Sequence, residues 1–314
     1  MEYITLKAGK YEAHILPEAG GNVIYFYDRE QQREILKGTH DLEALKKRPT
    51  VYGMTLLFPP NRIDGGCFCY DGREYRLPVN EPARNNHIHG FFKTADYQVV
   101  AEQHTAEKAE VVLEYLFAEN DPNFIYFPHK MRIRKAYELT AGGLKTRLTI
   151  ANLSDRKMPV MFAYHTAFPL MADRQQAAEM NIRLSVKARV QLDERLLGTE
   201  SYIAGDAIAE VAAENGFSPL AEEMDNVYRM KSFGFRGAIL TYPAYQAQTV
   251  YEVDDIFHYF VVWNSGANGE ILCLEPQTCR NNGINLPSWE KDGIDLSVGE
   301  EISAVTIVSS EDIS

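Results

Sequence analysis

The chain has 314 residues, of which 45% are hydrophobic and 24% are charged, the ordinary composition of a water-soluble globular protein. Its formal net charge of −12 disfavours binding to nucleic acid or to anionic membrane surfaces, because both reward a basic face. No apolar run approaches the roughly 20 residues of a membrane span. The length suits one large all-β domain or two domains of average size.

The N-terminus and the cysteines indicate a cytoplasmic protein. The first seven residues lack the basic start and the apolar stretch of a secretory signal. The four cysteines, Cys67, Cys69, Cys273 and Cys279, are too few for a disulfide framework in a chain of this length. We expect reduced thiols that are buried as small apolar groups, with a catalytic thiol as the alternative.

The first regular element that the sequence predicts is a short helix, capped by Asp41 and ending at Lys47, before Pro49. Beyond it, apolar side chains alternate with polar ones, which is typical of strands with one face in the core and one in water. This alternation covers 111–117, 131–139, 144–150 and 182–192. A glycine turn at 141–143 joins the second and third of these strands into a hairpin.

The C-terminal third continues in the same way. An alanine-rich stretch at 204–213 predicts a helical turn or a loop. Further strands are expected at 260–263, 271–274 and 302–308. Because long helices do not alternate with the strands, a parallel βαβ sheet is disfavoured. We predict a single all-β domain, residues 1–314, with many antiparallel strands in two large packed sheets.

Glu275 is the most informative residue of the chain. It directly follows the apolar run 271–274, and an acidic side chain at the end of a core strand needs a polar partner. Suitable partners lie in two distant segments: Arg62, His87, His89 and His165. A carboxylate, imidazoles and an arginine, without a metal cluster, suit acid–base chemistry on a sugar.

Several of these residues also have plainer interpretations. His87 and His89 share one face of a strand, as a metal-binding pair does, but no third ligand lies at a comparable spacing, and we predict no metal site. A histidine among apolar residues, such as His165, is often a core group. Arg62 alone suits a surface ion pair, and Asp225 alone suits a turn or a cap.

Taken in chain order, these segments resemble the aldose 1-epimerase (galactose mutarotase) superfamily over most of the sequence. The matching motifs are Asn61-Arg62-Ile63, His89-Gly90, Tyr164-His165 with Phe168, Asp225 with Tyr228, and Glu275-Pro276-Gln277-Thr278. The resemblance implies a β-supersandwich of large, mostly antiparallel packed sheets, with a sugar cleft on one sheet and no cofactor. It also implies that Glu275 and His165 are catalytic, and that Arg62, His89 and Asp225 bind the substrate.

Three residues depart from the family's pattern. Phe91 stands where a second glycine often follows the His-Gly pair, Tyr97 stands near the place of a tryptophan, and Asn226 replaces a histidine that often follows the aspartate. These changes leave the acid and the base in place and bear on which sugar is bound.

The predicted function is therefore that of an aldose 1-epimerase, or mutarotase, which interconverts the α and β anomers of an aldose. In this hypothesis Glu275, as base, takes the anomeric hydroxyl proton while His165, as acid, protonates the ring oxygen from the other side of the pyranose. Phe68, Tyr164 or Phe168 would flank the sugar. The expected partner is a small-molecule sugar, not nucleic acid or a membrane, and the chain is expected to be a monomer or a homodimer.

The sequence also suggests the protonation states of Glu275 and His165, and it leaves three alternative functions open. Ordinary pKa values let a glutamate carboxylate and a partly protonated histidine coexist near neutrality, and Asp225 would favour the imidazolium. One alternative is a hexose-6-phosphate 1-epimerase with a phosphate pocket formed by Arg62, Arg84, Lys93 and Arg280. The others are a non-catalytic carbohydrate-binding or sensor protein, and a glycoside hydrolase that uses Glu275 and Asp225 as its carboxyl pair.

Overall fold

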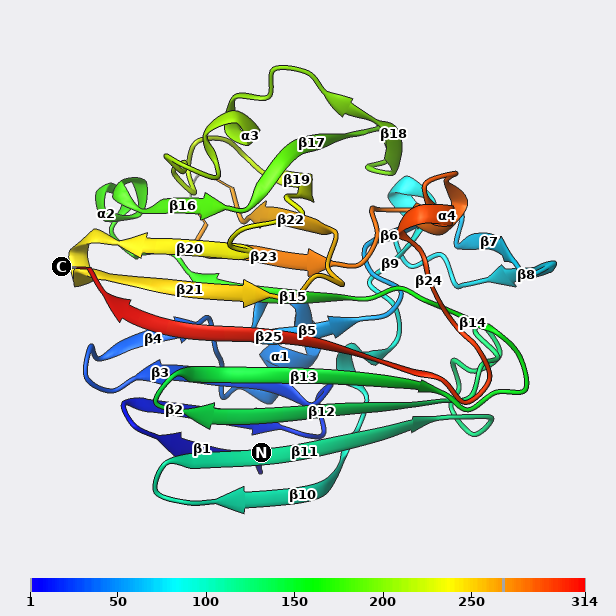
Figure 1. Ribbon diagram of the computed structural model, residues 1–314, viewed down its shortest axis with the longest axis horizontal. Helices are drawn as coiled ribbons and strands as arrows, with labels where there is room; N and C mark the ends of the chain where they lie inside the picture. The colour runs from blue at the N-terminus through cyan, green and yellow to red at the C-terminus, as the bar shows by residue number, and fades with distance from the viewer. Residues whose placement is uncertain (1, 267–268, 314) are drawn as a thin grey trace.

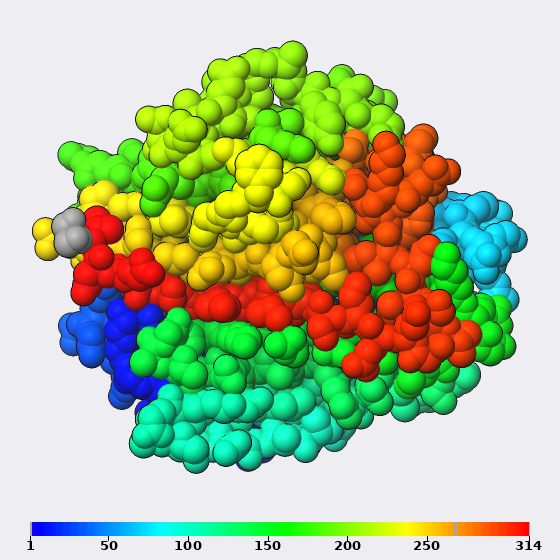
Figure 2. All heavy atoms as spheres, viewed as in Figure 1, coloured from blue at the N-terminus to red at the C-terminus, as the bar shows by residue number. Residues whose placement is uncertain are grey.

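Long antiparallel strands dominate the computed structural model, which describes residues 2–266 and 269–313. Within this part of the chain, the largest sheet has eight strands, in the spatial order β10 (Gln98–His104), β11 (Lys108–Phe117), β12 (Met131–Thr140), β13 (Gly143–Asn152), β25 (Glu301–Asp312), β21 (Ala247–Val253), β20 (Gly237–Tyr242) and β16 (Asn181–Leu184). The last strand, β25, lies in the middle of this sheet (Figure 1). Figure 2 shows the same face, where the red band of β25 separates the green and yellow strands.

A second sheet of the described residues supplies most of the candidate site. Its strands lie in the order β18 (Gly198–Ile203), β17 (Val186–Leu192), β19 (Asp225–Met230), β22 (Tyr259–Asn264), β23 (Ile271–Gln277), β15 (Ala163–Pro169) and β5 (Met54–Leu57). The central strands β22, β23 and β15 are buried along nearly their whole length, so both faces of the sheet are covered there.

Smaller elements surround these two sheets. Four N-terminal strands form a separate sheet: β1 (Ile4–Ala8), β2 (Tyr11–Leu16), β3 (Asn22–Asp28) and β4 (Arg33–Leu36). Three two-stranded pairs follow: β6 (Arg62–Asp64) with β9 (Asn86–Ile88), β7 (Cys67–Tyr70) with β8 (Arg73–Arg76), and β14 (Met158–Val160) with β24 (Ile294–Leu296). The α-helices are short: α1 (Leu42–Lys47), α2 (Arg174–Glu179), α3 (Ala207–Val211) and α4 (Trp289–Asp292). The 3₁₀ turns are η1 (Pro49–Val51), η2 (Pro82–Arg84), η3 (Phe92–Thr94), η4 (Pro243–Tyr245) and η5 (Gly283–Asn285).

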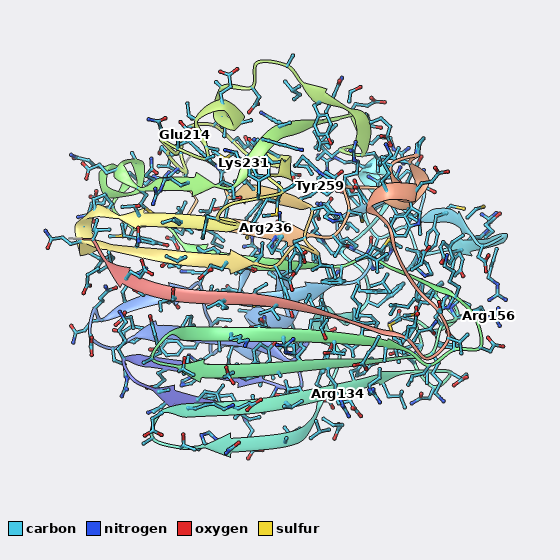
Figure 3. The ribbon with its side chains drawn as sticks, in the orientation of Figure 1. Arg134, Arg156, Glu214, Lys231, Arg236 and Tyr259 are labelled. Atoms are coloured by element: carbon cyan, nitrogen blue, oxygen red, sulfur yellow. The ribbon has the colours of Figure 1, made fainter. Side chains whose placement is uncertain are left out.

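Alternating burial explains why the predicted hairpin forms. Met131, Ile133, Tyr137 and Leu139 on β12 are fully buried, whereas Arg134 between them points to solvent, where its Nε lies 2.6 Å from a Glu114 carboxylate oxygen. Figure 3 labels Arg134 over the green strands of this sheet. The predicted turn at 141–143 joins β12 to β13 with Thr140 opposite Gly143. One continuous apolar cluster contains residues of the eight-stranded, the seven-stranded and the four-stranded sheet.

The predicted helix after Asp41 is confirmed, because the Asp41 side chain accepts hydrogen bonds from the amides of Glu43 and Ala44 at the start of α1. In the alanine-rich stretch, Asp206 caps α3 in the same way. The expected all-β fold of antiparallel packed sheets is also confirmed. None of the helices in the described ranges combines the length and the apolar character needed to cross a bilayer.

Two expectations about strand ends are wrong. The segment 182–192 is not one strand, because it breaks at Ser185 into β16 and β17, which belong to different sheets. The Ser185 amide and hydroxyl instead donate to the carbonyls of Gly237 and Phe235, at 2.9 and 2.6 Å. Glu275 does not follow its strand but lies inside β23, which continues to Gln277.

Candidate active site

Cross-strand register brings the predicted acid–base pair together. On β15 and β23, Ala163 pairs with Gln277 and Thr166 pairs with Leu274, a register that places His165 opposite Glu275. Side chains directly opposite each other on antiparallel strands project from the same face of the sheet. His165 Nε2 lies 3.1 Å from Glu275 Oε1, and the two side chains are 7% and 2% exposed. The pair is thus in direct contact, rather than separated by the width of a pyranose.

Burial opposes a charge on either member of this pair. Burial and the Asp225 carboxylate raise the pKa of Glu275 well above its usual range, against the opposing effect of Arg62. Burial and the positive charge of Lys93 lower the pKa of His165 to about 3. The two groups therefore favour a protonated carboxyl beside a neutral imidazole. This state and the carboxylate–imidazolium state expected from the sequence contain the same number of protons. They differ only in whether the shared proton is on Glu275 Oε1 or on His165 Nε2, which lie 3.1 Å apart.

A strained turn places His89 beside the pair. The backbones of His89 and Gly90 both have positive φ, at 64° and 59°. The His89 amide donates to the Asn61 carbonyl at 3.0 Å, and the Gly90 backbone lies against the Phe58 carbonyl. The His89 ring meets the His165 ring edge-on, with centroids 5.3 Å apart. Burial lowers the pKa of His89, and its Nδ1 has no hydrogen-bond partner among the described residues.

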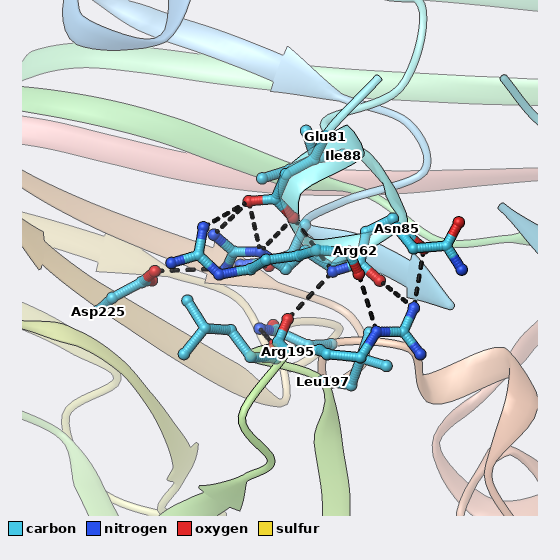
Figure 4. A network of polar contacts seen from close by, with 12 residues as sticks. Arg62, Glu81, Asn85, Ile88, Arg195, Leu197 and Asp225 are labelled. Carbon is cyan, nitrogen blue, oxygen red and sulfur yellow. Dashed lines mark hydrogen bonds and ion pairs between the residues drawn. The ribbon is translucent and has the colours of Figure 1, made fainter. Parts of the chain in front are cut away.

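An ion-pair network fixes Arg62 at the edge of the site (Figure 4). Arg62 Nε donates to both carboxylate oxygens of Glu81, at 3.0 and 3.2 Å, and Nη2 donates to Glu81 at 3.2 Å. Arg62 Nη1 donates to Asp225 Oδ2 at 3.3 Å. Glu81 also accepts from the Asn86 side-chain amide at 3.1 Å, which orients the carboxylate. Glu81 therefore braces Arg62 on one side while Asp225 meets it on the other.

One cavity of about 360 Å³, a size that suits a small ligand, contains Arg62, His89, His165, Asp225 and Glu275 in its lining. Its lining consists of Lys47, Arg48, Pro49, Thr50, Val51, Asn61, Arg62, His89, Lys93, His165, Asp225, Trp263 and Glu275. All five site residues predicted from the sequence are in this set. Glu275 Oε2 is buried beside the cavity without a hydrogen-bond partner among the described residues, so an acceptor is free there for a ligand hydroxyl.

The sequence did not single out every residue of the lining, nor Glu81, which lies outside the lining and pairs with Arg62. Trp263 pairs with Asp225 across β19 and β22 and lines the cavity. In the sequence, the signal that could have identified it is a tryptophan directly after the apolar strand segment 260–262. Lys47 and Arg48 end a short surface helix, where basic residues are commonplace. Glu81 stands in no motif, and only its contact with Arg62 reveals it.

The aromatic residues expected beside the sugar lie elsewhere. Phe68 stacks on Tyr75 in the core, with ring centroids 4.6 Å apart. Tyr164 and Phe168 are fully buried and do not line the cavity. Among the described residues, the lining contains Trp263 but none of the three expected aromatic side chains.

Several other predicted groups also lie outside the cavity. His87 uses Nδ1 to contact the Pro78 carbonyl at 2.8 Å and does not pair with His89. The described ranges contain no cluster of three or more His, Cys, Asp or Glu side chains placed to hold a metal ion. Cys273 and Cys279 are buried, as expected, whereas Cys69 is exposed and Cys67 is half-buried.

The residues that depart from the family pattern are outside the lining as well. Phe91 packs on His87 and on Tyr126. Tyr97 is buried in the core. Asn226 turns away from the cavity, and its amide donates to Glu222 at 2.8 Å.

Comparison with known proteins shows the family to which the chain belongs. The family model described as aldose 1-epimerase matches residues 2–309. The chain belongs to the aldose 1-epimerase family. The chain is also 24% identical over 297 residues to the uncharacterised Escherichia coli K12 protein YihR, a match that covers 93% of this chain and 87% of YihR.

Solved structures of family members have the same fold. A galactose mutarotase-like protein from Clostridium acetobutylicum is 30% identical, with a TM-score of 0.93 over 99% of this chain and 95% of that one. The GalM/aldose epimerase homologue of C. elegans is 14% identical, with a TM-score of 0.80 over 100% and 99% of the two chains. The galactose 1-epimerase of Lactobacillus acidophilus NCFM is 18% identical, with a TM-score of 0.76 over 98% and 94%. The galactose mutarotase-like fold inferred from the sequence is thereby confirmed.

Proposed function

We propose that the protein is an aldose 1-epimerase that interconverts the α and β anomers of a sugar, with Glu275 and His165 as its acid–base pair. The contact between these two side chains in a ligand-sized cavity is the observation that supports this most directly. The anomeric hydroxyl oxygen and the ring oxygen of an aldose share one carbon. Two proton-transfer groups in mutual contact are therefore close enough to serve both oxygens.

Ring opening begins from the pair as Glu275 carboxylate and His165 imidazolium. Glu275 takes the proton of the anomeric hydroxyl, His165 gives its proton to the ring oxygen, and the bond between C1 and that oxygen breaks. Opening leaves a protonated carboxyl and a neutral imidazole, the state that burial favours. After rotation about C1–C2, the two groups exchange roles, and the ring closes on the other face of the aldehyde.

The remaining site residues bind and orient the sugar in this proposal. Arg62, held between Glu81 and Asp225, donates hydrogen bonds to sugar hydroxyls, and Asp225 accepts them. Neutral His89, which lines the cavity and whose buried Nδ1 has no partner among the described residues, contributes an imidazole to sugar binding. Trp263 supplies an apolar face for the ring. We place the enzyme in the cytoplasm, because all four cysteines are free thiols.

Replacing the carboxyl tests the proposal. Glu275→Gln keeps the shape of the side chain but removes its proton transfer, and a positioned proton transfer contributes roughly 10²–10⁴ in rate. We expect kcat for anomer exchange, followed by saturation-transfer NMR, to fall by that factor while the sugar still binds. The matched control is Glu138→Gln on the outer face of β12, which should leave the rate unchanged. Near-wild-type exchange by Glu275→Gln would exclude Glu275 from the chemistry.

The two other classes of function give different results. A glycoside hydrolase would release the aglycone from an aryl glycoside, and that release would depend on both Glu275 and Asp225. A carbohydrate sensor would bind sugar without accelerating anomer exchange. The contacts of Phe91 and Asn226 favour the enzyme over the sensor, because these departures from the family pattern do not reach the cavity.

A further inference from the structure

One wall of the cavity is cationic. Lys47 at the end of α1, Arg48 directly after it and Lys93 in η3 all line the cavity that contains Glu275 and His165. The two segments are adjacent in space, because η1 follows Arg48 and contacts both η3 and β15. Residues some 45 positions apart in the sequence thus form a single basic wall beside the acid–base pair. This concentration of positive charge stands out in a chain whose net charge is −12.

These three cations have no counter-charge of their own. No ion pair joins any of them to a carboxylate within residues 2–266 and 269–313, whereas Arg62 across the cavity pairs with both Glu81 and Asp225. Lys93 is the most enclosed of the three, and burial lowers the pKa of its amine to about 8. Enclosing an ammonium group without a partner costs free energy that a bound anion would recover.

The carboxyl groups of the cavity do not supply that counter-charge. Asp225 is engaged by Arg62, with Oδ2 3.3 Å from Nη1. Glu275 is in contact with His165, and burial holds its pKa well above the usual range, which favours the uncharged carboxyl. A ligand that satisfies the wall must therefore bring its own negative charge.

We propose that the substrate of this site is an aldose with an anionic substituent, a carboxylate, phosphate or sulfonate, which Lys93 binds together with Arg48 and Lys47 while C1 lies at Glu275 and His165. This inference rests on the proposed epimerase function and specifies its substrate class. Of the four cations first considered for a phosphate pocket, Arg62 and Lys93 line the cavity. Arg84 instead pairs with Glu81, and Arg280 donates to Tyr259.

The wall also couples substrate binding to the chemistry. The charge of Lys93 is one of the causes that hold His165 unprotonated. An anion bound to Lys93 offsets this repulsion and favours the imidazolium that begins ring opening. A neutral sugar lacks this effect, so an anionic substrate gains in turnover as well as in binding.

The experiment compares anomer exchange of a neutral sugar, glucose, with that of glucose 6-phosphate, glucuronate and 6-sulfonated glucose by saturation-transfer NMR. We expect at least one anionic sugar to have a kcat/KM about tenfold or more above that of glucose, since a charge-assisted hydrogen bond contributes that much. The advantage should shrink in high salt, because screening weakens exposed charges. The anion with the largest advantage identifies the substituent.

Two variants and a control locate the effect. Lys93→Met should reduce the anionic-to-neutral ratio of kcat/KM about tenfold, and Arg48→Gln, at an exposed position that is safe for folding, should reduce it by a smaller factor. Lys46→Met, next to Lys47 but outside the cavity, should not change it. Equal kcat/KM for all four sugars, or a ratio unchanged in both Lys93→Met and Arg48→Gln, overturns the inference and leaves the epimerase function intact.

A binding measurement keeps the two proposals separable. Titration of the same four sugars, followed by the fluorescence of Trp263 in a Trp289→Phe background, reports on occupancy of the cavity without turnover. Tighter binding of an anionic sugar that Lys93→Met abolishes, without anomer exchange of any sugar, supports the basic wall and refutes the epimerase. Preferential binding of glucose refutes the wall.

Discussion

His165 and Glu275 lie opposite each other on β15 and β23, with Nε2 3.1 Å from Oε1, in surroundings that favour the uncharged form of both side chains. Burying two titratable side chains in this state has a cost in stability. The raised pKa of Glu275 means that the folded chain keeps a proton which the unfolded chain has lost. Folding therefore becomes less favourable as the pH rises above the unfolded glutamate's value of about 4.5, until the folded pKa is passed.

We predict that Glu275→Gln stabilises the protein at alkaline pH while it removes activity. Glutamine cannot ionise, so the variant does not lose stability as the pH rises. Each unit by which the pKa of Glu275 is raised on folding corresponds to about 1.4 kcal/mol of stability. The measurement is the free energy of unfolding in urea of the variant minus that of the wild type. We expect this difference to be at least about 1 kcal/mol larger at pH 8 than at pH 4. A difference between variant and wild type that stays constant with pH would show that Glu275 ionises normally in the folded chain.

The acid side of the pH–rate profile gives a second prediction. If His165 had an ordinary pKa, it would become protonated between pH 7 and pH 5 while Glu275 stayed protonated. Neither side chain could then accept the proton of the anomeric hydroxyl. Because the pKa of His165 lies near 3, we expect kcat for anomer exchange to change less than twofold between pH 7 and pH 5, after subtraction of the uncatalysed rate. A fall with a midpoint near 6.5 would contradict the buried, uncharged imidazole.

The contact between Glu81 and Arg62 gives the third prediction. Burial opposes the charge on Glu81, but the hydrogen bonds from Arg62 and Asn86 hold its pKa below the usual value. Glu81→Gln removes charge-assisted hydrogen bonds of about 1.5–3 kcal/mol, so we expect kcat/KM to fall about tenfold or more as Arg62 loses its orientation.

The stability of Glu81→Gln should depend on pH in the sense opposite to Glu275→Gln. A lowered folded pKa stabilises the chain above the unfolded value, and this contribution is lost as the pH falls through the folded pKa. The destabilisation by Glu81→Gln should therefore be present at pH 7 and shrink below about pH 4. Glu74→Gln, in an exposed ion pair with Arg76, is the control and should change stability by less than about 0.5 kcal/mol. Equal activity in the two variants would mean that Glu81 does not position Arg62.

The sequence predicted local structure well where neighbouring residues determine it. Alternation and a glycine turn defined β12 and β13, and a capping aspartate defined α1, because these signals act over a few residues. Alternation continued through 182–192 even though the chain changes sheets at Ser185. Which sheet a strand joins depends on partners such as Gly237, some fifty residues away, and no local pattern encodes that choice.

Some residues of the candidate site could be recognised from the sequence, and others only from the fold. Glu275 and His165 were predictable, because a carboxylate and an imidazole in apolar strand segments contrast with their neighbours and match a known family. Lys47 and Arg48 resemble solvated surface residues until the fold places them beside Lys93. The protonation state of the pair was also beyond the sequence, since it depends on how completely the finished fold excludes water from both groups.

The turn that positions His89 gives the final prediction, in which two glycines form a matched pair. Gly90 and Gly72 both have positive φ, at 59° and 73°. A Cβ at Gly72 would meet nothing within 4 Å, whereas a Cβ at Gly90 would lie 2.0 Å from the Phe58 carbonyl oxygen. Gly72→Ala should therefore cost only the left-handed backbone penalty of about 1–2 kcal/mol. Gly90→Ala adds a backbone clash, so we expect a loss at least about twice as large in urea unfolding, together with a lower kcat/KM because His89 is displaced from His165. Equal stability of the two variants would show that the close approach to Phe58 does not constrain the His89 turn.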